Sequence, residues 1–173
     1  NPKEMELFKN YFKEQPHEHK LFIFGNHEKI DKQVNYWIDY LEGETGAKCI
    51  HEKEHTINGL KFFGTSYTPA FMHWGFMQDD ETRKRYWENM LDDMDVLVTH
   101  GPPKGIMDKI ESGLSIGCEY LREFVDRVKP KYHFFGHNHA GAGVQHNGDT
   151  MFVNAAILTE SYRKCKPPIV VNL

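Results

Sequence analysis

The sequence predicts an α/β protein with a mixed sheet. Short apolar runs typical of buried strands alternate with amphipathic helical segments, and two Asn-Gly pairs indicate hairpins. The chain of 173 residues has room for one domain, so we expect residues 1–173 to form a single domain. Hydrophobic residues make up 39% of the chain, which is enough for a packed core and excludes a disordered protein.

In the first half, helices are expected where apolar residues recur every three or four positions, and strands where short apolar runs end at turn residues. Asn1 and Pro2 favour the start of the first helix. The aromatic segment 65–78 is broken by Pro69 and Gly75, so we expect a loop that either covers a substrate or simply packs on the domain. The expected elements here are a helix to about residue 14, a strand at 20–24, a helix at about 29–41, and hairpin strands at about 48–57 and 60–64.

The second half follows the same rules. Pro130 ends an amphipathic segment, and Asn147-Gly148 marks a second hairpin turn. The expected elements here are a charged helix at about 79–91, a buried strand at 95–99, a glycine-containing loop at 104–116, a helix at about 117–128, a buried strand at 132–135, hairpin strands at about 142–146 and 150–155, and a last strand at 167–173.

Composition excludes several classes of function. The formal net charge of -4 leaves no broad basic face for a phosphate backbone, so we expect no nucleic-acid partner. No apolar run approaches the ~20 residues of a membrane span, so we expect no membrane partner. Cys49, Cys118 and Cys165 are widely spaced, which indicates reduced thiols and a cytoplasmic location rather than a disulfide framework.

Three apolar strands each end in a turn that carries side chains suited to metal binding or proton transfer. Asn26 and His27 follow the first strand, His100 follows the second, and His137 and His139 follow the third. Ligands in open α/β sheets bind beyond the carboxyl ends of the strands. If these strands are neighbours and roughly parallel, the five side chains converge on one rim, and a glycine beside each turn lets the backbone come close to a bound group.

The donor types favour a hydrolytic metal site. Imidazole and amide donors without nearby thiolates suit Mn, Fe or Zn rather than a structural zinc domain rich in cysteine. Two divalent metals held about 3.5–4 Å apart suit phosphoester hydrolysis, because charge spreads over the phosphoryl oxygens. Any one histidine alone also fits an ordinary polar residue at a strand end. His133 is expected to be structural, and six further histidines are expected at the surface: His17, His19, His51, His55, His73 and His146.

These motifs carry a family resemblance that covers essentially the whole chain. The sequences Gly25-Asn26-His27-Glu28, Val98-Thr99-His100-Gly101-Pro102-Pro103 and Gly136-His137-Asn138-His139 resemble, in order and spacing, the later three motifs of calcineurin-like metallophosphoesterases. The Tyr67-Thr68-Pro69 loop and the segments Val153-Asn154-Ala155-Ala156 and Pro167-Pro168-Ile169-Val170 resemble the metallophosphoesterase domain-containing subgroup, which is related to cyclic-nucleotide phosphodiesterases.

The resemblance implies a sandwich of two mixed sheets with helices outside (α/β/β/α). It implies that Asn26, His100 and His137 are ligands of one metal and that His139 is a ligand of the other. It also implies that His27 is the catalytic histidine, which contacts the phosphoryl group and stabilises the transition state or protonates the leaving oxygen. An unperturbed pKa near neutrality suits a histidine to that task.

The chain departs from the family pattern in its first two motifs. It contains no Asp-x-His, and its only Gly-Asp lies in the hairpin turn at Gly148-Asp149. Three expected ligands, including the carboxylate that bridges the metals, are therefore missing. We expect that the chain lacks one N-terminal βαβ unit of ~30–50 residues, with the first strands of the sheet.

The expected function is hydrolysis of a small phosphodiester, of nucleotide type, through attack by a hydroxide that bridges two divalent metals such as manganese. This literal chain, without the bridging Asp, is expected to turn over weakly or not at all. The alternative is a catalytically inactive fragment or degenerate family member that acts as a metal-binding or interaction module.

Overall fold

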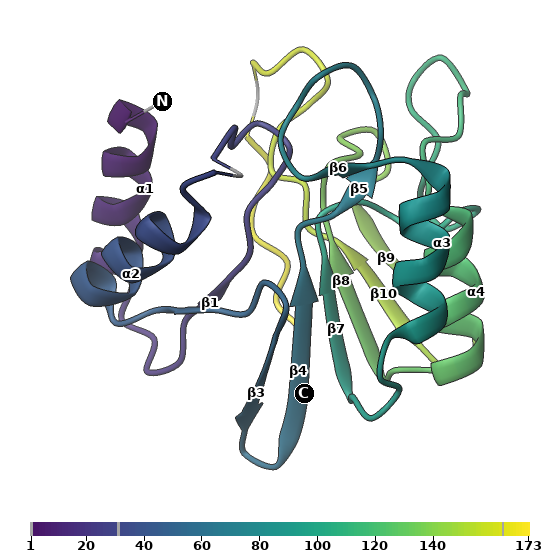
Figure 1. Cartoon of the computed structure of the whole chain (residues 1–173), viewed down its shortest axis with the longest axis horizontal. Coiled ribbons are helices and arrows are strands. Elements are labelled where there is room, and N and C mark those ends of the chain that lie inside the picture. The colour runs from purple at the N-terminus through teal and green to yellow at the C-terminus, as the bar shows by residue number, and fades with distance from the viewer. Residues whose placement is uncertain (1, 31, 164) are drawn as a thin grey trace.

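A six-stranded mixed sheet forms the centre of the molecule (Figure 1). The computed structural model describes residues 2–30, 32–163 and 165–173. The order of the strands across the sheet is β3-β4-β7-β8-β10-β9. Their bounds are Lys53–Ile57 (β3), Leu60–Thr65 (β4), Val96–Thr99 (β7), Tyr132–Phe135 (β8), Gly143–His146 (β9) and Met151–Asn154 (β10).

The four inner strands are parallel, and only the outer strands β3 and β9 run antiparallel to their neighbours. The register pairs Thr65 with Thr99 and Asn154 with Phe135. The carboxyl ends of the inner strands therefore lie along one edge, at the top of Figure 1. The loops that leave this edge are the ones expected to carry functional side chains.

Two helices cover one face of this sheet (Figure 1). Helix α3 spans Asp80–Asn89 and helix α4 spans Glu119–Val128. Asp79 caps α3 by accepting a hydrogen bond from the Thr82 amide, which is a common way to begin a helix. The helices and the sheet together enclose a core of Trp87, Leu97, Ile106, Cys118, Leu121, Phe124, Val125, Phe135 and Phe152.

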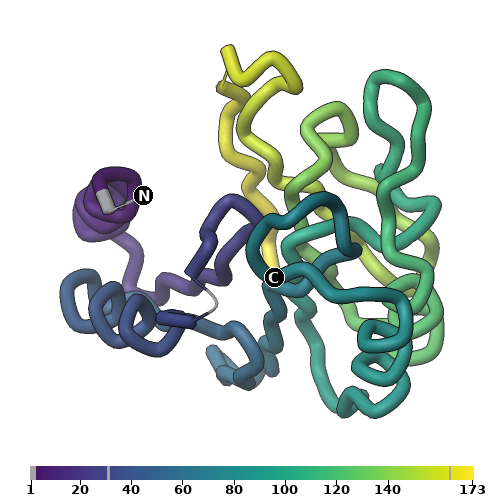
Figure 2. Tube along the Cα trace, turned by 45° about the horizontal axis from the view of Figure 1, so that its top comes forward, coloured from purple at the N-terminus to yellow at the C-terminus, as the bar shows by residue number. Residues whose placement is uncertain are grey.

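A second layer lies on the other side. Helix α1 (Pro2–Glu14), helix α2 (Val34–Thr45) and the parallel pair β1 (Leu21–Phe22) and β2 (Lys48–Cys49) form it. Figure 2 shows the two helices beside each other and away from α3 and α4. Its core consists of Met5, Phe22, Phe24, Ile38, Leu41, Ala47, Cys49 and Phe76. The two layers meet closely at Gly64, where a Cβ would lie 2.8 Å from Ile23 and Ile50 side-chain carbons.

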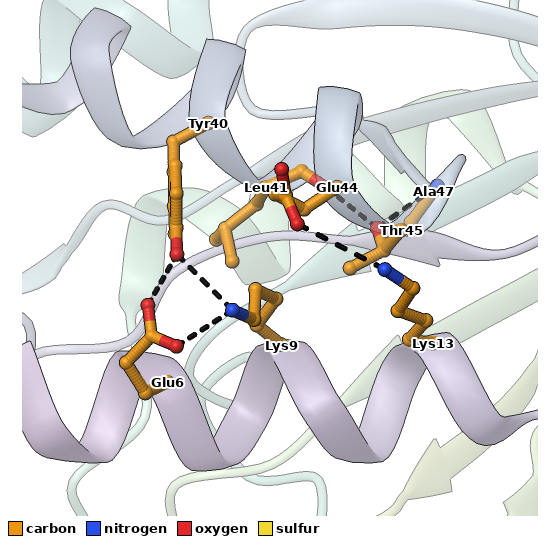
Figure 3. Close-up of polar contacts among 8 residues, drawn as sticks. All are labelled: Glu6, Lys9, Lys13, Tyr40, Leu41, Glu44, Thr45 and Ala47. Carbon is orange, nitrogen blue, oxygen red and sulfur yellow. Dashed lines mark hydrogen bonds and ion pairs between the residues drawn. The ribbon is translucent and has the colours of Figure 1, made fainter.

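Polar contacts join α1 to α2 at the surface (Figure 3). Lys9 Nζ donates to Glu6 Oε2 at 2.6 Å and to the Tyr40 hydroxyl at 3.2 Å, and Tyr40 donates to Glu6. Lys13 and Glu44 form a longer ion pair of 3.9 Å. Exposed pairs of this kind contribute little stability, so the apolar core beneath them holds the two helices together.

The mixed α/β class is confirmed, and the order of helices along the chain follows the sequence prediction. The second layer contains only the parallel pair β1–β2 as its sheet in the described part of the chain. The segment 65–78 contains two short strands, β5 (Thr68–Pro69) and β6 (Met77–Gln78), which pair in parallel. No helix in the described residues combines the length and apolar character needed to cross a membrane.

Two sequence predictions are wrong. The last strand predicted at 167–173 is irregular, because Pro167 and Pro168 lack N–H donors and Val170 is 85% exposed. His51, predicted at the surface, is buried: its Nδ1 accepts from the Ser66 amide at 3.1 Å and its ring packs on Tyr67. Alternating polarity around residue 51 resembles an edge strand, but the aromatic loop after β4 covers this ring.

Candidate metal centre and substrate pocket

The five predicted site residues line one pocket of about 580 Å³ at the carboxyl edge of the sheet. They are Asn26, His27, His100, His137 and His139. Strand β1 is not hydrogen-bonded into the large sheet, but the Phe24 amide donates to the Ser66 hydroxyl at 3.0 Å, which ties its carboxyl end to the loop after β4. This hydrogen bond places the 25–28 turn beside the turns after β7 and β8.

Asn26 is the most deeply buried of the five side chains, with 1% of its surface exposed. His100 Nε2 lies 2.7 Å from Asn26 Oδ1, so the imidazole N–H donates to the amide oxygen. The ring of His100 lies directly over Gly25, where a Cβ would be 2.7 Å from its Cε1 atom. Glycine at position 25 is therefore needed for this close approach.

His100 and His137 lie side by side, with ring centroids 4.7 Å apart. His137 has a φ of +65°, and the turn around it is held by Gly136 N–H, which donates to the His100 carbonyl at 3.0 Å. Burial, together with the neighbouring histidines, lowers the pKa of His100 to about 3 and that of His137 to about 4. Both rings are neutral at physiological pH, which is the state that binds metals.

A backbone carbonyl orients the ring of His139. Its Nδ1 lies 3.1 Å from the Thr159 carbonyl, so Nδ1 carries a proton and donates to that oxygen. A ring nitrogen held by a backbone carbonyl in this way commonly orients a metal-binding histidine. Tyr162, from the same loop as Thr159, packs edge-on against the His139 ring at 4.9 Å.

His27 is exposed at the mouth of the pocket. Trp74 packs against its ring with centroids 4.3 Å apart, and Tyr162 lies 6.4 Å away. The Gly75 amide donates to the Asn26 carbonyl at 2.9 Å, which fixes the aromatic loop against the turn that carries His27. An exposed imidazole whose ring packs against a neighbouring aromatic side chain can exchange a proton with a bound substrate.

Below the pocket, His133 supports the turn that carries His100. Thr99 Oγ1 donates to the Gly101 carbonyl at 2.7 Å, so His133 Nε2 must donate to Thr99 Oγ1 at 2.8 Å. The proton of His133 is thereby assigned to Nε2, and its Nδ1 is buried with no hydrogen-bond partner in the described residues. This confirms the structural role predicted for His133.

Asn138 connects the turn that carries His137 and His139 to the loop at 104–116. Its side chain is fully buried, and its Nδ2 donates to the carbonyls of Met107 at 2.6 Å and Lys109 at 3.0 Å. Gly141 allows this approach, because a Cβ there would lie 2.2 Å from the Met107 carbonyl oxygen. The loop beyond Lys109 supplies pocket walls, so one buried amide sets the walls relative to His137 and His139.

The donor set fits a divalent metal in type but not in number. Amide oxygen and neutral imidazole are suitable ligands for Mn, Fe or Zn. Across the described parts of the chain, however, no group of three or more His, Cys, Asp or Glu side chains is arranged to hold a metal. Glu160 is the single carboxylate that lines this pocket in the described residues, and it accepts from the Glu111 amide at 2.8 Å.

Sequence reasoning missed several residues of the pocket. Trp74 lies in a segment for which a lid was one of two alternatives, and its indole does line the pocket. Tyr162 lies 23 positions beyond His139 and follows no strand, so no local signal indicates it. Asn138 escapes notice because it stands between two histidines that the sequence predicts as metal ligands.

The family model of the calcineurin-like phosphoesterases matches residues 2–141. The chain therefore belongs to the calcineurin-like phosphoesterase family, which comprises metal-dependent phosphoesterases in general.

Known relatives extend the match over nearly the whole chain. Metallophosphoesterase domain-containing protein 1 from Homo sapiens is 32% identical over 196 residues, covering 99% of this chain and 60% of the relative. The protein of the same name from Mus musculus has the same identity and coverage. The chain thus spans about 60% of the length of these relatives. A solved crystal structure with 18% identity matches the fold with a TM-score of 0.66, over 88% of this chain and 63% of that one.

Proposed function

We propose that this chain provides the substrate-facing part of a metal-dependent phosphoesterase that hydrolyses a small phosphodiester, with a nucleotide-type substrate. The observation that carries the proposal is the convergence of Asn26, His27, His100, His137 and His139 in one pocket. They come from three turns that are distant in sequence. All five are amide or imidazole side chains, which are suited to metal binding or proton transfer. Family membership supports phosphoester chemistry in general.

Asn26, His100 and His137 would hold one divalent metal, which would replace the hydrogen bond from His100 to Asn26, and His139 would contribute to a second. Such metals, when bound, would activate water as the nucleophile and neutralise charge on the phosphoryl oxygens. Mn, Fe and Zn all tolerate these donors. The hydrogen bond from His139 Nδ1 to the Thr159 carbonyl keeps Nε2 directed to this task.

His27 would act on the substrate itself. Its exposed ring would donate a proton to the leaving oxygen or a hydrogen bond to a non-bridging oxygen. Trp74 limits rotation of the ring by packing against it. Positioned acids of this kind contribute about 10²–10⁴-fold to rate.

A specific observation favours a second candidate, a non-catalytic metal-binding or interaction module. The described residues contain no group of three His, Cys, Asp or Glu arranged for a metal, and Glu160 is the one carboxylate among the described residues that line the pocket. Under this alternative the chain would bind metal weakly and turn over no substrate.

The test is hydrolysis of bis(4-nitrophenyl) phosphate by the purified chain with added Mn²⁺, Fe²⁺ or Zn²⁺, with metal binding measured by calorimetry in parallel. Where the gene encodes residues before Asn1, a version that includes them is assayed alongside. His137→Ala is expected to lose metal binding and hydrolysis. His27→Ala is expected to keep metal binding and lose about a hundredfold in kcat.

His146→Ala is the matched control, because His146 is exposed in strand β9 and does not line the pocket. It should behave as wild type. Metal binding without hydrolysis in every form would favour the non-catalytic module. Equal activity of His27→Ala and wild type would remove His27 from the mechanism.

A further inference from the structure

The pocket combines a polar floor with an apolar rim. The floor consists of Asn26, His100, His137 and His139, whereas His27 is exposed at the mouth and much of the rim is aromatic or aliphatic. Phe71, Leu114 and Tyr162 line the pocket and are 65%, 62% and 58% exposed. Large apolar side chains exposed around a polar centre are typical of sites for ligands with one polar and one apolar end.

The rings nearest the floor form a continuous run. Trp74 contacts His27 at 4.3 Å between centroids, Tyr162 lies 6.4 Å from His27, and Tyr162 contacts His139 at 4.9 Å. Trp74 and Tyr162 thus flank the histidine that we place at the leaving group. A substituent on the leaving oxygen of a phosphodiester would meet these two rings first.

The backbone that carries each of the two aromatic rings is held in place before any ligand arrives. Trp74 precedes Gly75, where a Cβ would lie 2.3 Å from the Glu28 carbonyl oxygen, so this segment is tightly packed on the His27 turn. The Tyr162 amide donates at 2.8 Å to the Thr159 carbonyl, the same oxygen that binds His139. Residues whose backbone is already ordered lose less entropy when a flat group stacks on their rings.

The charge of the pocket further restricts the class of ligand that it can bind. Of the described residues that line it, none is a lysine or arginine, and Glu160 adds a carboxylate. A substrate with several negative charges, such as a nucleoside triphosphate or a polynucleotide, would find no side-chain partner for the extra charge. A singly charged diester with an apolar substituent matches the pocket better.

We propose that Trp74 and Tyr162 determine the specificity of this site by stacking on a flat aromatic group carried by a singly charged phosphodiester. The inference rests on the proposed function, which it makes more specific. It assigns neither residue a part in the chemistry: both contact the leaving group. A nucleobase and a simple aryl ring share the required chemistry, and the experiment distinguishes them.

The experiment compares the affinities of Mn²⁺-loaded protein for diphenyl phosphate and dibutyl phosphate, both singly charged, by isothermal calorimetry. Wild type is expected to bind the aryl diester about tenfold more tightly. Tyr162→Leu and Trp74→Leu are each expected to lose most of that preference, while affinity for dibutyl phosphate stays within about twofold. Tyr162→Phe keeps the ring and should retain the preference. A nucleoside methyl phosphate in the same titration shows whether a nucleobase is accepted like a phenyl ring.

Tyr36→Leu is the matched control, because Tyr36 is 62% exposed on α2 and outside the pocket. It should change neither affinity. A second measurement follows quenching of Trp74 fluorescence by 4-nitrophenyl methyl phosphate, as the difference between wild type and Trp74→Phe. This readout depends on contact with the ring and not on turnover.

Equal affinity for the two diesters, equal losses for both in Tyr162→Leu, or no measurable binding of diphenyl phosphate would each overturn the inference. Hydrolysis of alkyl and aryl diesters with equal efficiency would leave the proposed function standing and refute the specificity. An aryl preference in binding without any hydrolysis would support the specificity and refute the proposed function.

Discussion

Replacement of His133 by phenylalanine is predicted to remove part of the protein's sensitivity to acid. The ring of His133 is fully buried near Phe135 and Phe152, and this burial lowers its pKa from 6.5 to about 3. Between these values the unfolded chain binds a proton that the folded chain does not. The associated stability is therefore fully present above pH 6.5 and is lost as the pH falls toward 3.

The size of the effect follows from the width of that window. Each pH unit inside it changes the free energy of unfolding by about 1.4 kcal/mol. A shift from about pH 7.5 to about pH 4.5 therefore costs wild type about 3 kcal/mol through His133 alone. His133→Phe avoids this loss but gives up the hydrogen bond to Thr99, worth about 1 kcal/mol. The variant should be about 1 kcal/mol less stable at the higher pH and about 2 kcal/mol more stable at the lower.

The assay is urea unfolding followed by tryptophan fluorescence, with a chelator present at both pH values so that the other histidines remain free of metal. Other titrating groups are common to both proteins and cancel in the difference. Phe135→Leu, a non-titrating change beside the His133 ring, serves as the control and should lose the same free energy at both pH values. If His133→Phe also shows the same difference at both pH values, His133 is not held neutral by burial and the reasoning is refuted.

Three further substitutions test the scaffold of the pocket. Asn138→Ala leaves the Met107 and Lys109 carbonyls without their donor, so we expect a loss of about 2–4 kcal/mol in urea unfolding and faster hydrogen exchange across 104–116; unchanged exchange would contradict the anchoring role. Gly141→Ala places a Cβ 2.2 Å from the Met107 oxygen and should lower the thermal midpoint by several degrees, whereas Gly43→Ala, in helix α2 with nothing within 4 Å, should raise it slightly. Asn26→Ala removes a donor oxygen and the partner of His100, so Mn²⁺ affinity measured by calorimetry should fall about tenfold or more, and an unchanged affinity would exclude Asn26 as a ligand.

Local patterning predicts the elements of this fold well where the signal is short-range. The apolar runs before Gly101 and Gly136, and the Asn58-Gly59 turn, correspond to β7, β8 and the β3–β4 hairpin. The strand expected at 20–24 shortens to Leu21–Phe22, because the chain leaves its partner β2 to reach the Ser66 hydroxyl. Such an exit depends on a residue 42 positions away and has no local signal.

The residues of the pocket likewise fall into those that the sequence predicts and those that it does not. Ligand-type residues directly after strands are visible in the sequence, because strand ends determine their location. The residues that shape the pocket around them are not: Tyr162 reaches it through a loop after β10, and Asn138 through bonds to carbonyls about 30 positions earlier. Backbone carbonyls carry no sequence signature, so long-range contacts to them become apparent only in three dimensions.

The division of the hydrophobic interior into two cores has a consequence for how the molecule opens. The core around α1, α2 and β1–β2 shares no buried member with the core under α3 and α4. We expect two such cores, which meet at Gly64, to open with different free energies. The smaller unit carries Asn26 and His27 on its margin, whereas the larger unit carries His100, His137 and His139. Transient release of the smaller unit would therefore split the pocket and leave three histidines on an intact sheet.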